Sequence, residues 1–136
     1  GRRSQQNSDA MLSMTTRVNG VIATGNWLHD SASLELLGAP NDQLTARWQS
    51  VRPRAVELQM EAAALGMASG SQQRDSALNS LSQAVGSFVS AMDGYVSLQS
   101  TGGEHVTPEL LTSARQSVEA RRRDLGAAMA SVSGAR

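Results

Sequence analysis

The chain has 136 residues, no cysteine and a formal net charge of zero. This length suits one domain with an apolar core, and the missing cysteines exclude disulfides and thiolate metal sites. All twelve basic residues are arginines, which excludes Schiff-base lysines and the lysine of a phosphate-binding loop. Because the charge is balanced, there is no electrostatic footprint for nucleic acid, and we expect no such partner.

The first predicted helix covers residues 8–37. Its apolar stripe is less regular than those of the later helices, and two glycines in it lower its intrinsic stability. Polar residues at 30–33 predict a bend or a break. Gly38 and Pro40 then end the helix. The stripe consists of Met11, Met14, Val18, Val21 or Ile22, Gly25 and Leu28.

The second and third predicted helices cover residues 42–68 and 72–100. Each carries apolar residues at alternating spacings of three and four, which predicts one seam packed against a partner helix. Pro53 lies inside the second helix and should kink it, because its nitrogen cannot donate a hydrogen bond. The two seams are Leu44, Trp48, Val51, Ala55, Leu58, Ala62 and Leu65, and Leu78, Leu81, Val85, Phe88, Met92, Tyr95 and Gln99.

The fourth predicted helix covers residues 108–132 and opens with Thr107, Pro108 and Glu109, a favourable start for a helix. Its seam is Leu111, Ala114, Val118, Leu125, Ala128 or Met129, and Val132. Four helices of similar length with short connections predict an all-α fold, an antiparallel up-down-up-down four-helix bundle that forms a single domain over residues 1–136. An even number of passes predicts that both ends of the chain lie at the same end of the bundle.

Two arginines interrupt the seam of the fourth helix. The position between Val118 and Leu125 falls on Arg121 or Arg122, where a bundle normally places an apolar residue. In one interpretation both side chains straddle the seam and extend outward to solvent. In the other, one of them points at a carboxylate, either Glu57 or Glu61 or a bound anion. If the helices are aligned at their midpoints, small residues leave room opposite this position: Ala55, Gly86, and Ala23 or Gly25.

The same alignment places the aromatic residues Trp27, Trp48 and Tyr95 together with Met92. Core packing is the simpler interpretation of such a cluster, and an aromatic wall for a small ligand is the alternative. The candidate ligand-binding residues are therefore Arg121, Arg122, Trp27, Trp48 and Tyr95.

No catalytic or metal-binding motif accompanies the helices. A diiron bundle needs Glu-x-x-His pairs, and neither His29 nor His105 follows a glutamate by three residues. His29 and Asp30 are adjacent, and we interpret them as a solvated cap. We therefore predict no enzymatic activity, no metal and no cofactor.

In layout the predicted bundle resembles the extracytoplasmic four-helix ligand domains of chemoreceptors and sensor kinases, although it shares no specific motif with them. Those domains are similar in size, have both ends at the membrane and use arginines to hold anionic ligands between helices. The resemblance implies a non-enzymatic sensory module of a membrane receptor, with a small anionic ligand as partner. Because the chain begins with Gly1, we interpret it as a fragment whose membrane segments lie elsewhere.

A second hypothesis is a soluble helical adaptor or secretion-associated protein that binds partner helices. The looser stripe of the first helix, with Met11, Leu12 and Met14, is then the natural contact face, and it could also form a homodimer. The composition leaves the cellular compartment open, with an extracytoplasmic location favoured.

Overall fold

The computed structural model describes residues 2–68, 70–101 and 105–135, with side chains from residue 12 onward. Helices account for nearly all of these residues, and no strand occurs among them. The elements are α1 (Arg2–Trp27), the π-helix η1 (Leu28–Ala32), α2 (Ser33–Leu37), α3 (Asn41–Gly66), α4 (Gln72–Thr101) and α5 (Pro108–Ala135). The predicted all-α helical bundle is therefore confirmed.

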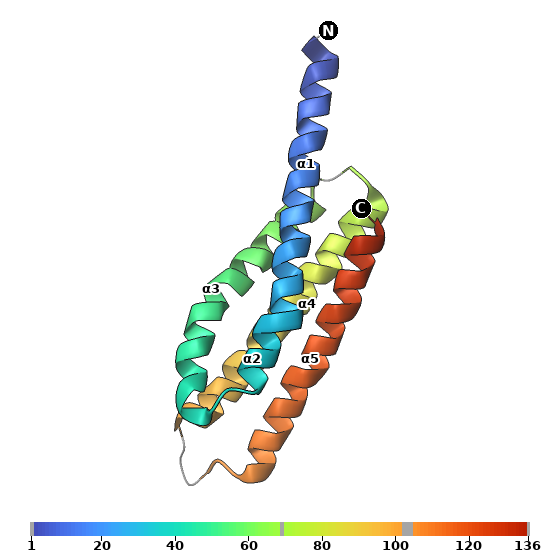
Figure 1. Cartoon of the computed structure of the whole chain (residues 1–136). Coiled ribbons are helices and arrows are strands. Elements are labelled where there is room, and N and C mark those ends of the chain that lie inside the picture. The colour runs from blue at the N-terminus through green and yellow to red at the C-terminus, as the bar shows by residue number, and fades with distance from the viewer. Residues whose placement is uncertain (1, 69, 102–104, 136) are drawn as a thin grey trace.

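The helices lie side by side along one long axis (Figure 1). Following the colours, the chain descends α1 to α2, rises through α3, descends α4 and rises through α5. Helix α4 contacts α3 and α5 most extensively, whereas α1 contacts α3 more than α5. Gly70 turns the chain between α3 and α4 with a φ of 79°, a backbone conformation that favours glycine. The first and last residues of the chain, Gly1 and Arg136, lie outside the described residues.

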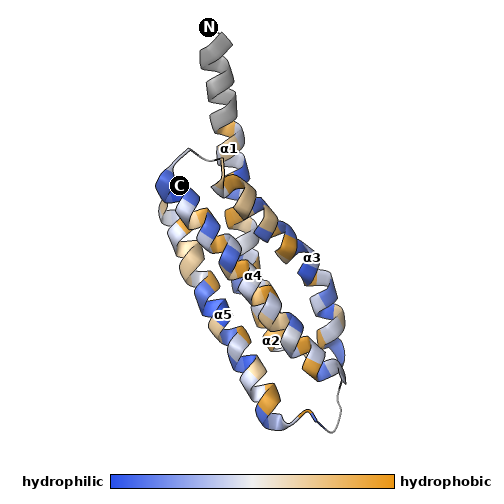
Figure 2. Cartoon of the chain, turned by 180° about the vertical axis from the view of Figure 1, so that it is seen from behind, coloured by the Kyte–Doolittle hydropathy of each residue, from blue (hydrophilic) through white to orange (hydrophobic). Residues whose placement is uncertain are grey.

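The apolar seams predicted for α3, α4 and α5 form the core. Four seam positions deviate, because Val51, Gln99, Leu111 and Ala114 are half-buried instead of buried. Figure 2 shows hydrophobic and hydrophilic residues interspersed along each helix, as expected when every helix buries one face. The remaining seam residues are buried: Leu44, Trp48, Ala55, Leu58, Ala62, Leu65, Leu78, Leu81, Val85, Phe88, Met92, Tyr95, Val118, Leu125, Ala128, Met129 and Val132.

Helix α3 continues through Pro53 as one element. A proline nitrogen cannot donate to the carbonyl four residues back, so the Gln49 carbonyl loses its usual partner. Ala55 and Leu58 on the far side of Pro53 are nevertheless buried in the same core as Trp48. Packing along the seam therefore holds the helix together where its own ladder is interrupted.

The first predicted helix differs from the structure in its internal geometry. Residues 8–37 were expected to form one helix with a bend or break near 30–33, and the structure instead inserts the π-helix Leu28–Ala32 between α1 and α2. A π-turn accommodates one extra residue without interrupting the helix. We call α1, η1 and α2 together (Arg2–Leu37) the N-terminal arm.

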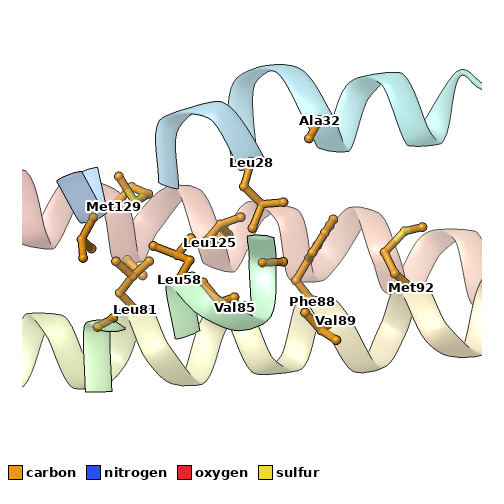
Figure 3. Close-up of a cluster of buried hydrophobic side chains, with 14 of the residues drawn as sticks. Leu28, Ala32, Leu58, Leu81, Val85, Phe88, Val89, Met92, Leu125 and Met129 are labelled. Carbon is orange, nitrogen blue, oxygen red and sulfur yellow. The ribbon is translucent and has the colours of Figure 1, made fainter. Parts of the chain in front are cut away.

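The N-terminal arm buries its own apolar stripe against the other helices. Leu28 is fully buried and points toward the layer that contains Phe88 and Leu125 (Figure 3). The extra residue of the π-turn shifts the phase of the stripe, so that Ala32 at the end of η1 and Leu36 in α2 continue it. Among the arm side chains from residue 12 onward, Val18, Val21 and Ile22 are also buried.

Candidate functional site

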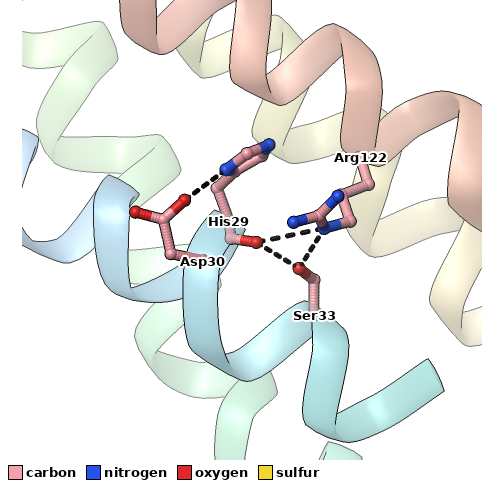
Figure 4. Close-up of polar contacts among 4 residues, drawn as sticks. All are labelled: His29, Asp30, Ser33 and Arg122. Atoms are coloured by element: carbon pink, nitrogen blue, oxygen red, sulfur yellow. Dashed lines mark hydrogen bonds and ion pairs between the residues drawn. The ribbon is translucent and has the colours of Figure 1, made fainter. Parts of the chain in front are cut away.

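The π-helix leaves one backbone carbonyl without its usual partner. In an α-helix the Ser33 N–H would donate to the His29 carbonyl, but here it donates to Leu28, five residues back. The Ser33 hydroxyl replaces it and donates to the His29 carbonyl at 2.6 Å (Figure 4). Because Ser33 is fully buried, its hydroxyl would destabilise the fold if it had no hydrogen-bond partner.

Arg122 supplies the second donor to this turn of backbone. Its Nε donates to the His29 carbonyl at 3.1 Å and to the Ser33 hydroxyl at 2.8 Å, reaching across from α5 (Figure 4). Arg122 is thus the seam arginine that turns inward, but its partners are a backbone carbonyl and a hydroxyl, whereas the prediction of an inward arginine named a carboxylate. The predicted internal carboxylate is wrong, because in the described structure Arg122 contacts neither Glu57 nor Glu61.

Arg121 lies at the margin of the seam. Its Nε is 3.3 Å from a carboxylate oxygen of Asp124, one turn along α5, and 43% of its side chain is exposed. This agrees with the interpretation in which a seam arginine extends outward. The two adjacent arginines therefore have different surroundings.

The room expected opposite these arginines is occupied. A Cβ at Gly86 would lie 2.6 Å from the Gln59 side-chain amide, and one at Gly25 would collide with Met129. The prediction that aligned the helices at their midpoints was also wrong about the arm. It placed residues 23–25 beside the seam arginines, but Arg122 forms hydrogen bonds with residues 29 and 33. The small residues allow helices to approach closely and do not open a cavity.

The His29 side chain extends from the arm and lies against α5. Its Nδ1 lies 2.6 Å from Asp30, and a Cβ at Gly126 would lie 2.7 Å from its Nε2. The absence of a side chain at Gly126 therefore makes room for the imidazole. His29 is therefore packed at a junction between helices, whereas Asp30, with 66% of its side chain exposed, is solvated as predicted.

The aromatic residues are distributed over separate contacts. Trp48 packs edge-on against Phe88, with ring centroids 6.3 Å apart, and its Nε1 donates to Asp93 at 2.8 Å. Trp27 instead faces the Arg54 guanidinium, whose central carbon lies 3.9 Å from the ring centroid. Tyr95 is buried, and its hydroxyl accepts from Gln99 at 3.3 Å. Trp48 and Tyr95 belong to the core, which is the simpler of the two predicted interpretations.

Asp93 accepts hydrogen bonds from two residues of α3, one of which is positively charged. Besides Trp48, Arg52 donates to it from Nε and Nη2 at 3.0 and 3.1 Å. Burial by itself would raise the pKa of Asp93, but the hydrogen bonds from Arg52 and Trp48 and the charge of Arg52 together lower it below its ordinary value. This contact joins α3 to α4.

A groove of about 660 Å³ lies between α1 and α3. This volume is in the range typical of small-molecule sites. Its lining combines two arginines, two glutamates and apolar side chains, among them Arg17, Arg54, Glu57, Glu61, Val21 and Met60. Arg17 and Glu61 close a salt bridge across it at 2.8 Å, which raises the pKa of Arg17 through the hydrogen bond and the charge of Glu61.

The other two charged residues of the groove, Arg54 and Glu57, are not in any ion pair within the described residues. Arg54 is held by the face of Trp27, and Glu57 follows it by one turn of α3. Sequence analysis missed Arg17 and Arg54 as site residues and considered Glu57 only as a partner for a seam arginine. The sequence feature that could have indicated this site is the set of charged residues beside the α3 seam, at positions 54, 57 and 61.

Comparisons with protein-family models, curated proteins and solved structures give no match to this chain. Within the described residues, no helix is both long and apolar enough to cross a membrane. The same residues contain no group of three or more histidines and carboxylates placed to hold a metal ion.

Proposed function

We propose that this chain is a non-enzymatic sensory module, of the kind carried by membrane receptors, which binds a small carboxylate-bearing molecule in the groove between α1 and α3. The observation that supports this most directly is Arg54. Arg54 lines the groove, its guanidinium lies over the Trp27 ring, and it has no carboxylate partner among the described residues.

The chemistry of Arg54 suits an anion. The cation–π contact holds the guanidinium over the Trp27 ring and uses no acceptor for its five N–H donors. These donors match the two oxygens of a carboxylate. Arg17, Arg52 and Arg121, by contrast, each lie beside a carboxylate of the protein itself.

The position of the groove connects binding to a change in the bundle. A ligand between α1 and α3 contacts the N-terminal arm and the rest of the molecule at once. If the arm has two positions, a ligand shifts their populations by the difference between its affinities for them. Binding in the groove would therefore change the populations of these arm positions.

Thermal unfolding with a panel of small carboxylates tests this proposal. A true ligand raises the melting temperature as its concentration increases, and Arg54→Gln should abolish the increase. Arg47→Gln is the matched control, because Arg47 is also on α3 but bonds to Gln43 outside the groove. The proposal fails if no carboxylate stabilises the protein, or if both variants respond as the wild type does.

A second candidate function is the soluble adaptor that binds partner helices. It is favoured by exposed apolar side chains, since Leu12, Met60 and Met67 are 67%, 66% and 85% exposed. Sedimentation of the purified chain distinguishes a homodimer through α1 from a monomer. If the wild-type chain is a dimer and Leu12→Ser converts it into a monomer, this result supports the adaptor hypothesis. Carboxylate binding would instead support the sensor hypothesis.

A further inference from the structure

We infer that the ligand of the α1–α3 groove is a zwitterion, a small molecule with both a carboxylate and an ammonium group, such as an amino acid. This inference rests on the proposed function and concerns the same groove. It follows from the charges that the groove leaves without partners, one of each sign.

The four charged groups of the groove divide into a closed pair and an open pair. Arg17 and Glu61 neutralise each other at 2.8 Å across the two helices. Arg54 and Glu57 do not form an ion pair, although residues three apart on a helix are neighbours on one face. The contact of Arg54 with Trp27 holds the guanidinium at 3.9 Å from the ring centroid, so Trp27 and not Glu57 is its partner.

This arrangement discriminates between classes of ligand by repulsion as well as attraction. A simple anion attracted by Arg54 also meets the like charge of Glu57, and a simple cation attracted by Glu57 meets Arg54. A zwitterion can present its carboxylate to Arg54 and its ammonium to Glu57. Specificity of this kind needs the repulsive element as much as the attractive one.

The groove also provides contacts for a short apolar part of such a molecule. Val21 and Leu58 lie in its floor as buried residues, and Met60 lines it as an exposed one. A methionine side chain is flexible and adapts to irregular ligands. We therefore place the zwitterion with its charged groups at Arg54 and Glu57 and its carbon chain against the apolar residues of the groove.

Paired titrations test the inference. Isothermal calorimetry compares glycine, β-alanine and γ-aminobutyrate with acetate, propionate and butyrate, each pair differing mainly in the ammonium group. We expect at least one amino acid to bind ten-fold or more tightly than the matching acid. Glu57→Gln should reduce this advantage to less than about two-fold, whereas Arg54→Gln should remove binding of both compounds. Glu35→Gln, an exposed glutamate of the arm outside the groove, is the matched control and should change neither.

The outcomes separate this inference from the proposed function. If acids bind as tightly as amino acids and require Arg54, the zwitterion is wrong and the carboxylate-binding function stands. If neither class binds, both are wrong. If the amino acids bind better but Glu57→Gln leaves their advantage intact, the ammonium site assigned to Glu57 is overturned.

Discussion

The N-terminal arm and the three-helix unit of α3, α4 and α5 are held in place by different kinds of contact. In the three-helix unit the contacts follow long apolar seams, and α4 lies between its two partners. The arm contributes a shorter apolar stripe and is also fastened by arginines. Arg122 donates to the His29 carbonyl, Arg115 donates to the Leu37 carbonyl at 2.6 Å, and Arg17 pairs with Glu61.

The two arginines of α5 act on the arm in the same way. Arg115 satisfies a carbonyl in the last turn of α2, where helix carbonyls have no partner within the helix. Arg122 does so at the carbonyl that the π-turn leaves open. Apolar periodicity therefore assembles the three-helix unit, whereas specific donors fix the position and phase of the arm. Four predictions test this difference between the two regions.

The largest effect is expected in the three-helix unit. Phe88 is fully buried on α4, the helix that contacts both partners. Phe88→Ala removes a large side chain and leaves a cavity, which should lower the free energy of unfolding by about 3–5 kcal/mol. Urea unfolding followed by circular dichroism measures this value. A loss below about 1 kcal/mol would show that the seam of α4 is not the main source of stability.

Two glycines should respond to alanine with opposite signs. At Gly25 the new Cβ would collide with Met129, which is buried and must repack, so Gly25→Ala should destabilise the chain by about 1–3 kcal/mol. At Gly94 nothing lies within 4 Å, and alanine should stabilise α4 by about 0.5–1 kcal/mol. Thermal unfolding of both variants checks the signs. Equal changes would contradict a close approach between the arm and α5.

Loss of the Arg122 donor should affect the arm more than the rest of the molecule. Arg122→Ala leaves the His29 carbonyl with Ser33 alone and should cost about 1–2 kcal/mol. Hydrogen exchange should accelerate at residues 28–37 more than in α4. Arg123→Ala, an exposed neighbour on α5, serves as the control and should leave exchange unchanged. Uniform acceleration over all helices would show that the arm does not open separately.

The smallest effect concerns Asp93 and depends on pH. Because the pKa of Asp93 is lowered in the folded protein, its contribution is complete above the unfolded pKa of about 3.9 and is lost as the pH falls through the folded value. The group is partly exposed, with 41% of its side chain accessible, so screening limits Asp93→Asn to about 1 kcal/mol or less at pH 7.

The difference between wild type and Asp93→Asn should therefore disappear in acid. Urea unfolding at pH 7 and at a pH well below about 3.9 measures it, and tryptophan fluorescence reports on the partner Trp48. A difference that stays constant with pH would mean that the carboxylate charge does not stabilise the contact between α3 and α4.

The helices and their buried faces were predictable from the sequence, because the spacing of apolar residues is a local property that survives any choice of partner. The seams from Leu44 to Leu65 and from Leu78 to Tyr95 illustrate this, as does the cap of α5, where the Thr107 hydroxyl accepts from the Leu110 N–H at 3.1 Å. Continuity through Pro53 followed from the same periodicity.

The tertiary structure alone decided which seam arginine turns inward and what it meets. Positions 121 and 122 straddle the seam, and a helix of 3.6 residues per turn drifts by about 20° per heptad, so spacing could not choose between them. The π-turn at Leu28–Ala32 leaves the His29 carbonyl without its usual helical donor, and no residue pattern in the sequence predicts this. The groove between α1 and α3 arose in the same way, because Arg54 and Glu57 come from one helix and Arg17 from another, and only the packing of the arm brings their charges together.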